Sequence, residues 1–202
     1  MAPAEHMAGG EGDVARQRLA QERRDLAKDC PFGCYARPIK LADGSTDVMT
    51  WAAGIAPRSG SAYALAPGEN YRLQLKFPLS YPSEPPLVSF VPPVFHTNVW
   101  ADSGLVCLSL LLDAGHHGGT VRSCWSPLLS LKEILLALQS LLDEPNPASV
   151  ANAEACELLR KSGVSAYTAR VKSEAAAYPA RLARYMAALA VSPAAAAAAA
   201  KL

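Results

Sequence analysis

The chain has neither a long apolar run nor a marked excess of charge of one sign. No apolar stretch reaches the roughly 18 residues that a membrane-spanning helix needs, and residues 1–12 lack the apolar core of a secretory signal. Its 19 basic residues nearly balance its 18 acidic residues, so the total charge indicates neither nucleic acid nor an anionic membrane as a partner. We therefore expect a soluble, intracellular protein whose electrostatic contacts are local.

Cysteine is scarce and shows no paired pattern; the five cysteines are Cys30, Cys34, Cys107, Cys124 and Cys156. An odd, scattered set suits a reducing compartment better than a disulfide framework, so at least one thiol is free to react. We interpret Cys30 and Cys34 as small buried or edge side chains. His116, His117 and Cys124 lack the spacing of a tetrahedral zinc site, so no metal is expected.

The N-terminal part predicts a short leader followed by an amphipathic helix. Residues 1–12, with two adjacent glycines, are expected to be a disordered leader, and Asp13 is a candidate N-cap. At about 100° per residue, Ala15, Leu19 and Leu26 share one helix face. An adjacent arc forms a basic stripe: Arg16, Arg23, Arg24 and Lys28.

The next segments predict an antiparallel meander. Asp43-Gly44 is a hairpin turn signal between expected strands at 35–41 and 47–55. Apolar and polar residues then alternate from Tyr71 to Phe77, and Leu87-Val88-Ser89-Phe90 is a further strand-like run. The alternation predicts one buried and one wet face.

Helices dominate the C-terminal half. A capping box at Ser130-Leu131-Lys132-Glu133 opens an apolar-faced helix at 131–142, and two prolines end it. Two further helices are expected at 152–161 and 164–177. The fold class is therefore α+β, with one core domain at 13–178.

From residue 179 the chain is rich in alanine, which favours a helix but offers no large side chains for docking. We expect 179–202 to be a mobile tail. Its last residues, Ala200-Lys201-Leu202, resemble the peroxisomal address Ser-Lys-Leu with its first residue changed. Our main interpretation is coincidence, and a peroxisomal location stays open as the lesser alternative.

The best evidence for chemistry is an amide side chain upstream of a thiol. Asn98 lies in Phe95-His96-Thr97-Asn98-Val99-Trp100, and Cys107 follows nine positions later in Gly104-Leu105-Val106-Cys107-Leu108-Ser109. A nucleophilic cysteine becomes acylated, and the oxyanion formed on transfer needs a preorganised donor such as an asparagine amide. Taken alone, however, a cysteine in an apolar run is more often a buried, inert thiol.

The surrounding motifs change that balance. They are Tyr81-Pro82-Ser83-Glu84-Pro85-Pro86, Pro92-Pro93-Val94-Phe95-His96, Trp125-Ser126-Pro127 and Glu144-Pro145-Asn146-Pro147. In this order and spacing they resemble the ubiquitin-conjugating enzymes. Within that family the chain is most similar to the SUMO-conjugating members, through Arg18-Leu19-Ala20-Gln21-Glu22-Arg23, Asp29-Cys30-Pro31-Phe32-Gly33 and Met49-Thr50-Trp51. The resemblance implies the ubiquitin-conjugating (UBC) fold: an N-terminal helix, a four-stranded antiparallel meander and C-terminal helices.

The resemblance implies that Cys107 accepts SUMO, or another ubiquitin-like protein, from an activating enzyme as a thioester and passes it to a substrate lysine. The activating enzyme consumes the ATP, so no cofactor is expected; the chain also has no P-loop or Rossmann glycine pattern. The implied partners are that modifier, the activating enzyme, ligases and lysine-bearing substrate proteins, without direct contact to nucleic acid or membrane. The implied location is the nucleus and cytoplasm.

The family pattern also implies roles beside Cys107. Asn98 stabilises the oxyanion or the loop that shapes the site, and His96 buttresses that loop. Thr97 replaces the family's proline, which removes a rigid φ constraint. Ser149 falls where many relatives carry an acidic residue that orients the incoming lysine; a plain N-cap for the next helix is an alternative role.

Trp100 and Cys156 stand where SUMO-conjugating members have aromatic residues that shape the substrate groove. Arg23, Arg24 and Lys28 match part of the surface that meets the activating enzyme and a noncovalently bound modifier, although exposed arginines on a first helix are often only a solvated face. The glycine-rich segment 113–124 is longer than in compact members and is expected to be a mobile loop.

Three alternatives stay open. A ubiquitin carrier would use the same thioester chemistry. A noncatalytic variant that only binds a ubiquitin-like protein usually lacks the active cysteine, so Cys107 and Asn98 argue against it. A thiol hydrolase would need a cysteine paired with a histidine, and no such signature is evident in the sequence.

Overall fold

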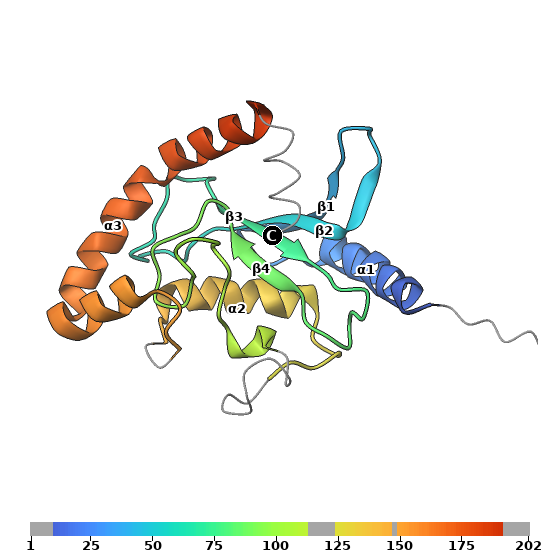
Figure 1. Ribbon diagram of the computed structural model, residues 1–202, viewed down its shortest axis with the longest axis horizontal. Coiled ribbons are helices and arrows are strands. Elements are labelled where there is room, and N and C mark those ends of the chain that lie inside the picture. Colours follow the sequence, from blue (N-terminus) through green and yellow to red (C-terminus); the bar gives the residue numbers. More distant parts are fainter. Residues whose placement is uncertain (1–9, 113–123, 147–148, 192–202) are drawn as a thin grey trace, which may run out of the picture.

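The computed structural model describes residues 10–112, 124–146 and 149–191. Helices lie on either side of a four-stranded antiparallel sheet in the order β1-β2-β3-β4 (Figure 1). The elements are α1 Glu11–Lys28, β1 Cys34–Lys40, β2 Thr46–Ile55, β3 Tyr71–Lys76, β4 Leu87–Phe90, the 3₁₀ turn η1 Ser109–Leu111, α2 Leu131–Asp143 and α3 Ala153–Val191. The predicted α+β class and element order are confirmed. None of the described helices combines the length and the hydrophobicity that a membrane-spanning segment requires.

The N-cap of helix α1 lies three residues earlier than predicted. Gly10 is its N-cap, without a side-chain cap hydrogen bond, and Asp13 lies inside the first turn with its N–H donated to the Gly10 carbonyl. The prediction of Asp13 as N-cap is therefore wrong, as is a leader that extends to residue 12; a carboxylate in the first turn still favours the helix through its dipole. Ala15, Leu19 and Leu26 are buried as expected.

The sheet follows the predicted meander. The hairpin between β1 and β2 turns at Gly44, whose φ of 84° is readily adopted only by glycine. In β3 the residues Tyr71, Leu73 and Leu75 are buried, while the intervening side chains are more exposed. This period-2 pattern aims one face of the sheet at the core.

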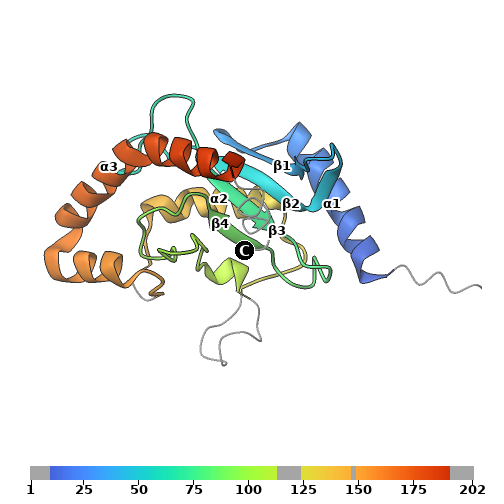
Figure 2. The ribbon, with the colours of Figure 1, turned by 45° about the horizontal axis from the view of Figure 1, so that its top comes forward.

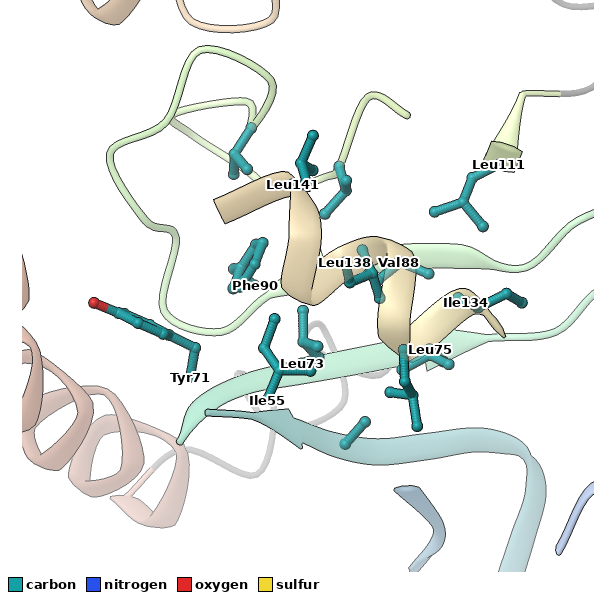
Figure 3. Close-up of a cluster of buried hydrophobic side chains, with 14 of the residues drawn as sticks. Ile55, Tyr71, Leu73, Leu75, Val88, Phe90, Leu111, Ile134, Leu138 and Leu141 are labelled. Atoms are coloured by element: carbon teal, nitrogen blue, oxygen red, sulfur yellow. The ribbon is translucent and has the colours of Figure 1, made fainter. Parts of the chain in front are cut away.

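Helix α2 covers that face. Both hydrogen bonds of the predicted capping box, between Ser130 and Glu133, are present. The buried side of α2 carries leucine and isoleucine, and Figure 3 shows Leu138 packed among Leu73, Val88 and Phe90 from β3 and β4. Burying each such side chain contributes roughly 1.5–3 kcal/mol.

A buried carboxylate joins α1 to α2. Glu22 accepts hydrogen bonds from the Arg18 guanidinium at 2.8 Å and from the N–H of Leu131 at 3.0 Å. Arg18 also donates to the carbonyls of Pro127 and Leu129. The network fixes the start of α2 against α1.

Helix α3 is much longer than predicted and curves around one end of the sheet, opposite α1 (Figures 1 and 2). The predicted break between two helices is confirmed at Gly163, with φ 78° and ψ 177°. Helical structure then continues through Pro179 to Val191, so the expected domain end at 178 and a tail from 179 are wrong for 179–191. Arg181 anchors this part by donating to Glu174 and to the carbonyl of Pro93.

Candidate functional site

The segment from Phe95 to Cys107 leaves the sheet after β4 and doubles back on itself. Val99 and Val106 form an isolated antiparallel bridge, and the N–H of Cys107 donates to the carbonyl of Asn98 at 2.8 Å. The reversal is made at Gly104, with φ 72°. Asn98 and Cys107, nine residues apart in sequence, therefore lie side by side on paired backbone.

Residue Cys107 is partly exposed rather than sealed in the core. Its sulfur lies 3.1 Å from the hydroxyl oxygen of Ser149, within hydrogen-bond reach. The structure thus joins two of the predicted site residues that are 42 positions apart in the chain. An accessible thiol beside a hydroxyl can accept an acyl group from a large partner.

Asn98 is fully buried and makes four side-chain hydrogen bonds. Its amide nitrogen donates to the carbonyls of Asn146 at 2.8 Å and Ser149 at 2.7 Å. Its amide oxygen accepts from the Thr97 hydroxyl at 2.9 Å and from the Asn146 N–H at 2.8 Å. Both amide hydrogens are committed to carbonyls, so of its two predicted roles this geometry supports shaping the loop.

His96 holds the same loop from inside the protein. Its Nε2–H donates to the carbonyl of Leu141 at 2.8 Å, and its Nδ1 accepts from the N–H of Asn98 at 3.0 Å. Burial lowers the pKa of His96 from 6.5 to about 4, an effect that the bond to Leu141 only partly offsets. The ring is therefore neutral at pH 7 and fits the predicted buttress role.

In the sequence, Thr97 is distinguished only by standing where the family pattern has proline. In the structure it is fully buried, and its carbonyl accepts the N–H groups of Ala151 and Asn152, both at 3.0 Å. Its hydroxyl bond to Asn98 is a contact that proline cannot make. Hydrogen bonds thus replace the lost ring constraint.

Ser149 does not cap α3. The helix begins at Ala153, and Asn152 supplies the cap, because its side-chain oxygen accepts the N–H of Ala155 at 3.1 Å. The predicted N-cap role of Ser149 is wrong, and its hydroxyl is directed instead at the Cys107 sulfur. The sequence did contain a signal for the true cap: asparagine is a favoured N-cap residue, and Asn152 stands three residues before Ala155, whose N–H it accepts.

Trp100 follows Asn98 by two residues in the same loop, and Cys156 lies near the start of α3. Trp100 is 44% exposed, and its backbone N–H donates to the backbone carbonyl of Leu105. Cys156 is partly exposed, its sulfur is 3.8 Å from the Thr97 carbonyl, and burial raises the pKa of its thiol. A raised pKa makes Cys156 a poor nucleophile compared with an ionised thiol.

The basic stripe of α1 is separate from this site. Arg23, Arg24 and Lys28 are all exposed, and the first two line a groove of about 470 Å³ that reaches Trp51 on β2. The groove has both basic and apolar residues in its lining, and the docking surface stays a prediction.

No metal centre is formed by the part of the chain that the structure describes. His116 and His117 lie outside the described residues, as does the expected loop except for Cys124. Asn146 is the site residue that sequence reasoning missed: it bonds Asn98 through both its carbonyl and its N–H. Only its place in the Glu144-Pro145-Asn146-Pro147 motif hinted at this role.

Comparisons with known proteins agree with this geometry. The family model for ubiquitin-conjugating enzymes matches residues 18–175. The chain is 39% identical over 169 residues to SUMO-conjugating enzyme UBC9 of Caenorhabditis elegans, covering 84% of this chain and 94% of that protein. It is 37% identical over 174 residues to SUMO-conjugating enzyme SCE1 of Arabidopsis thaliana, covering 86% and 99%. The chain belongs to the ubiquitin-conjugating enzyme family.

Proposed function

We propose that this protein is a SUMO-conjugating enzyme that carries SUMO as a thioester on Cys107 and transfers it to substrate lysines. The carrying observation is the partly exposed Cys107 thiol beside Ser149, on backbone that Asn98 pins in place. The choice of SUMO is supported by 37–39% identity to two SUMO-conjugating enzymes over nearly their whole lengths.

The proposed transfer needs two exchanges at one carbonyl carbon. The Cys107 thiolate attacks the thioester held by the activating enzyme, and its S–C bond forms as the bond to the other sulfur breaks. A lysine amine then attacks the same carbon, the C–N bond forms, the amine proton passes to solvent, and Cys107 leaves as thiolate. ATP is spent by the activating enzyme, so we propose no cofactor for this chain.

The surroundings of Cys107 suit a carrier better than a hydrolase. A hydrolase would place a histidine base on the thiol. His96, the only histidine in the described residues, has both ring nitrogens engaged elsewhere. A thioester on Cys107 is therefore spared the base that would help water cleave it.

The test is to incubate the protein with ATP and each purified activating system, SUMO or ubiquitin, and to run non-reducing gels. We expect a SUMO adduct that reductant removes. Cys107→Ser should replace it with a more stable oxyester. An adduct with ubiquitin alone would favour the ubiquitin carrier, and a labile adduct in Cys107→Ser would move the acceptor to another cysteine. The nuclear and cytoplasmic location stays part of this proposal.

A further inference from the structure

The hydroxyl group of Ser149 and the thiol of Cys107 are paired with each other. The oxygen lies 3.1 Å from the sulfur, and among the described residues neither side chain makes another hydrogen bond. The proposed transfer uses the sulfur as acceptor and leaves this oxygen without a chemical role. A serine hydroxyl is itself an acyl acceptor in the enzymes that form serine esters.

Both groups stand on backbone that Asn98 holds. The Asn98 carbonyl accepts the N–H of Cys107 at 2.8 Å, and its side-chain amide donates to the carbonyl of Ser149 at 2.7 Å. The N–H of Ser149 donates to the carbonyl of Asn146 at 3.2 Å, so the serine is tied on both sides. The approach of oxygen to sulfur is therefore set by paired backbone and by one buried amide.

The same contact places the oxygen beside an acyl group carried on the sulfur. In a thioester the carbonyl carbon is bonded directly to the Cys107 sulfur, so it lies one bond from an atom that is 3.1 Å from the Ser149 oxygen. Reacting atoms about 3–3.5 Å apart are close to attack geometry, and a nucleophile held in that way reaches an effective concentration of about 10⁵ M or more. Water attacks the same carbon from free solution without this advantage.

We infer that Ser149 is a second acceptor of the modifier, which it takes from Cys107 by an S-to-O acyl shift when no lysine amine arrives. This inference rests on the proposed thioester function. The Ser149 oxygen attacks the thioester carbonyl, the C–O bond forms as the C–S bond breaks, and the hydroxyl proton passes to the departing sulfur. The products are an oxyester on Ser149 and a Cys107 thiol, so atoms and charge balance without a co-reactant.

The shift is slower than transfer to lysine. His96, the only histidine in the described residues, has both ring nitrogens engaged, so the Ser149 hydroxyl has no histidine base and gives its proton to the leaving sulfur. A free amine is also a stronger nucleophile than a neutral alcohol. The oxyester therefore forms from thioester that waits without a substrate, and it holds the modifier in a form that amines remove more slowly.

The test starts from protein loaded with SUMO by the activating enzyme and ATP, after which the activating enzyme is quenched and all amines are left out. We expect the reductant-labile adduct to convert with time into one that resists reductant but is cleaved by mild alkali, as an ester is. Mass spectrometry of the digested adduct should place the modifier on Ser149. Free lysine added at the start should lower the yield, because its amine takes the same carbonyl.

Two variants at Ser149 separate the hydroxyl from the rest of the site. Conversion is scored as the share of the loaded thioester that becomes reductant-resistant, so differences in loading do not enter. In Ser149→Ala this share should fall at least about tenfold, since the held nucleophile is gone. Ser149→Thr keeps a hydroxyl and should retain the alkali-labile product.

The outcomes distinguish this inference from the function on which it rests. A labile adduct that only hydrolyses, a resistant adduct that survives alkali and is therefore an amide, an equal share in Ser149→Ala, a modifier mapped to another residue, or a yield that free lysine leaves unchanged would each overturn the acyl shift alone. If no reductant-labile adduct formed at all, the proposed function would fail and this inference with it.

Discussion

The hydroxyl oxygen of Ser149 lies 3.1 Å from the sulfur of Cys107, and the carbonyl of the same serine accepts the amide of Asn98. Ser149 therefore ties the start of the α3 region to both residues that sequence motifs identified. Its side chain faces the atom that would hold the modifier, so an incoming lysine amine has to pass close to it.

Ser149→Asp should speed discharge of the thioester to free lysine about tenfold at neutral pH. A carboxylate accepts a charge-assisted hydrogen bond from the amine, worth roughly 1.5–3 kcal/mol, whereas the serine hydroxyl makes a neutral one. The rate is measured by single-turnover discharge after the activating enzyme is quenched. Ser149→Asn is the matched control without charge and should stay near the wild-type rate; an equal gain in both variants would refute the electrostatic explanation.

Asn98→Asp should unfold at a lower temperature than the wild-type protein. The substitution keeps shape but replaces two N–H donors by oxygen, which would face the carbonyls of Asn146 and Ser149. Buried acceptors left unsatisfied cost about 1–3 kcal/mol each, so the free energy of unfolding should drop by a few kcal/mol. The readout is thermal and urea unfolding. If Asn98 served only as an oxyanion donor, stability would not change while discharge slowed.

His96 should make the protein less stable in mild acid. Burial holds the pKa of His96 at about 4 in the folded chain, against 6.5 in its usual state, so the unfolded chain binds more protons between these values. The contribution of His96 to the free energy of unfolding is fully present above about pH 6.5. It is lost as the pH drops toward 4, by about 3 kcal/mol in total. Urea unfolding from pH 7.5 to 4.5 measures it. His96→Gln should be less stable at neutral pH but lose less on acidification, and parallel pH curves would contradict this account.

Local signals in the sequence predicted most elements because their causes are local. The capping box at Ser130, the turn at Gly44 and the alternation in β3 each depend on a few neighbouring residues. The helix beyond Pro179 was missed because its support comes from distant contacts. Arg181 reaches the Pro93 carbonyl, and the Tyr178 hydroxyl accepts the N–H of Arg72.

The site was predictable only to the level of its motifs. Asn98 and Cys107 follow from a spacing that the family resemblance marks as functional. That Asn98 is buried with both amide hydrogens occupied, and that Ser149 touches the thiol, depends on where the α3 region docks. Residues close in sequence to Asn98 or Ser149 do not determine that long-range packing.

Gly104→Ala should disturb the Cys107 segment far more than an ordinary glycine substitution. Gly104 has φ 72°, and an added Cβ would lie 2.1 Å from the carbonyl oxygen of Phe90, whose own N–H is bonded to Gly104. The strand pair that carries Cys107 must therefore shift, at a cost on the order of 3 kcal/mol, and thioester formation should slow with it.

Gly60→Ala is the matched control, because its φ is also positive, 83°, but nothing lies within 4 Å of the new atom. That control should lose only about 1 kcal/mol and load normally, since the strain of a left-handed alanine is then the whole effect. Equal losses of stability in the two variants would mean that backbone strain alone, and not the contact with Phe90, explains the effect of Gly104→Ala.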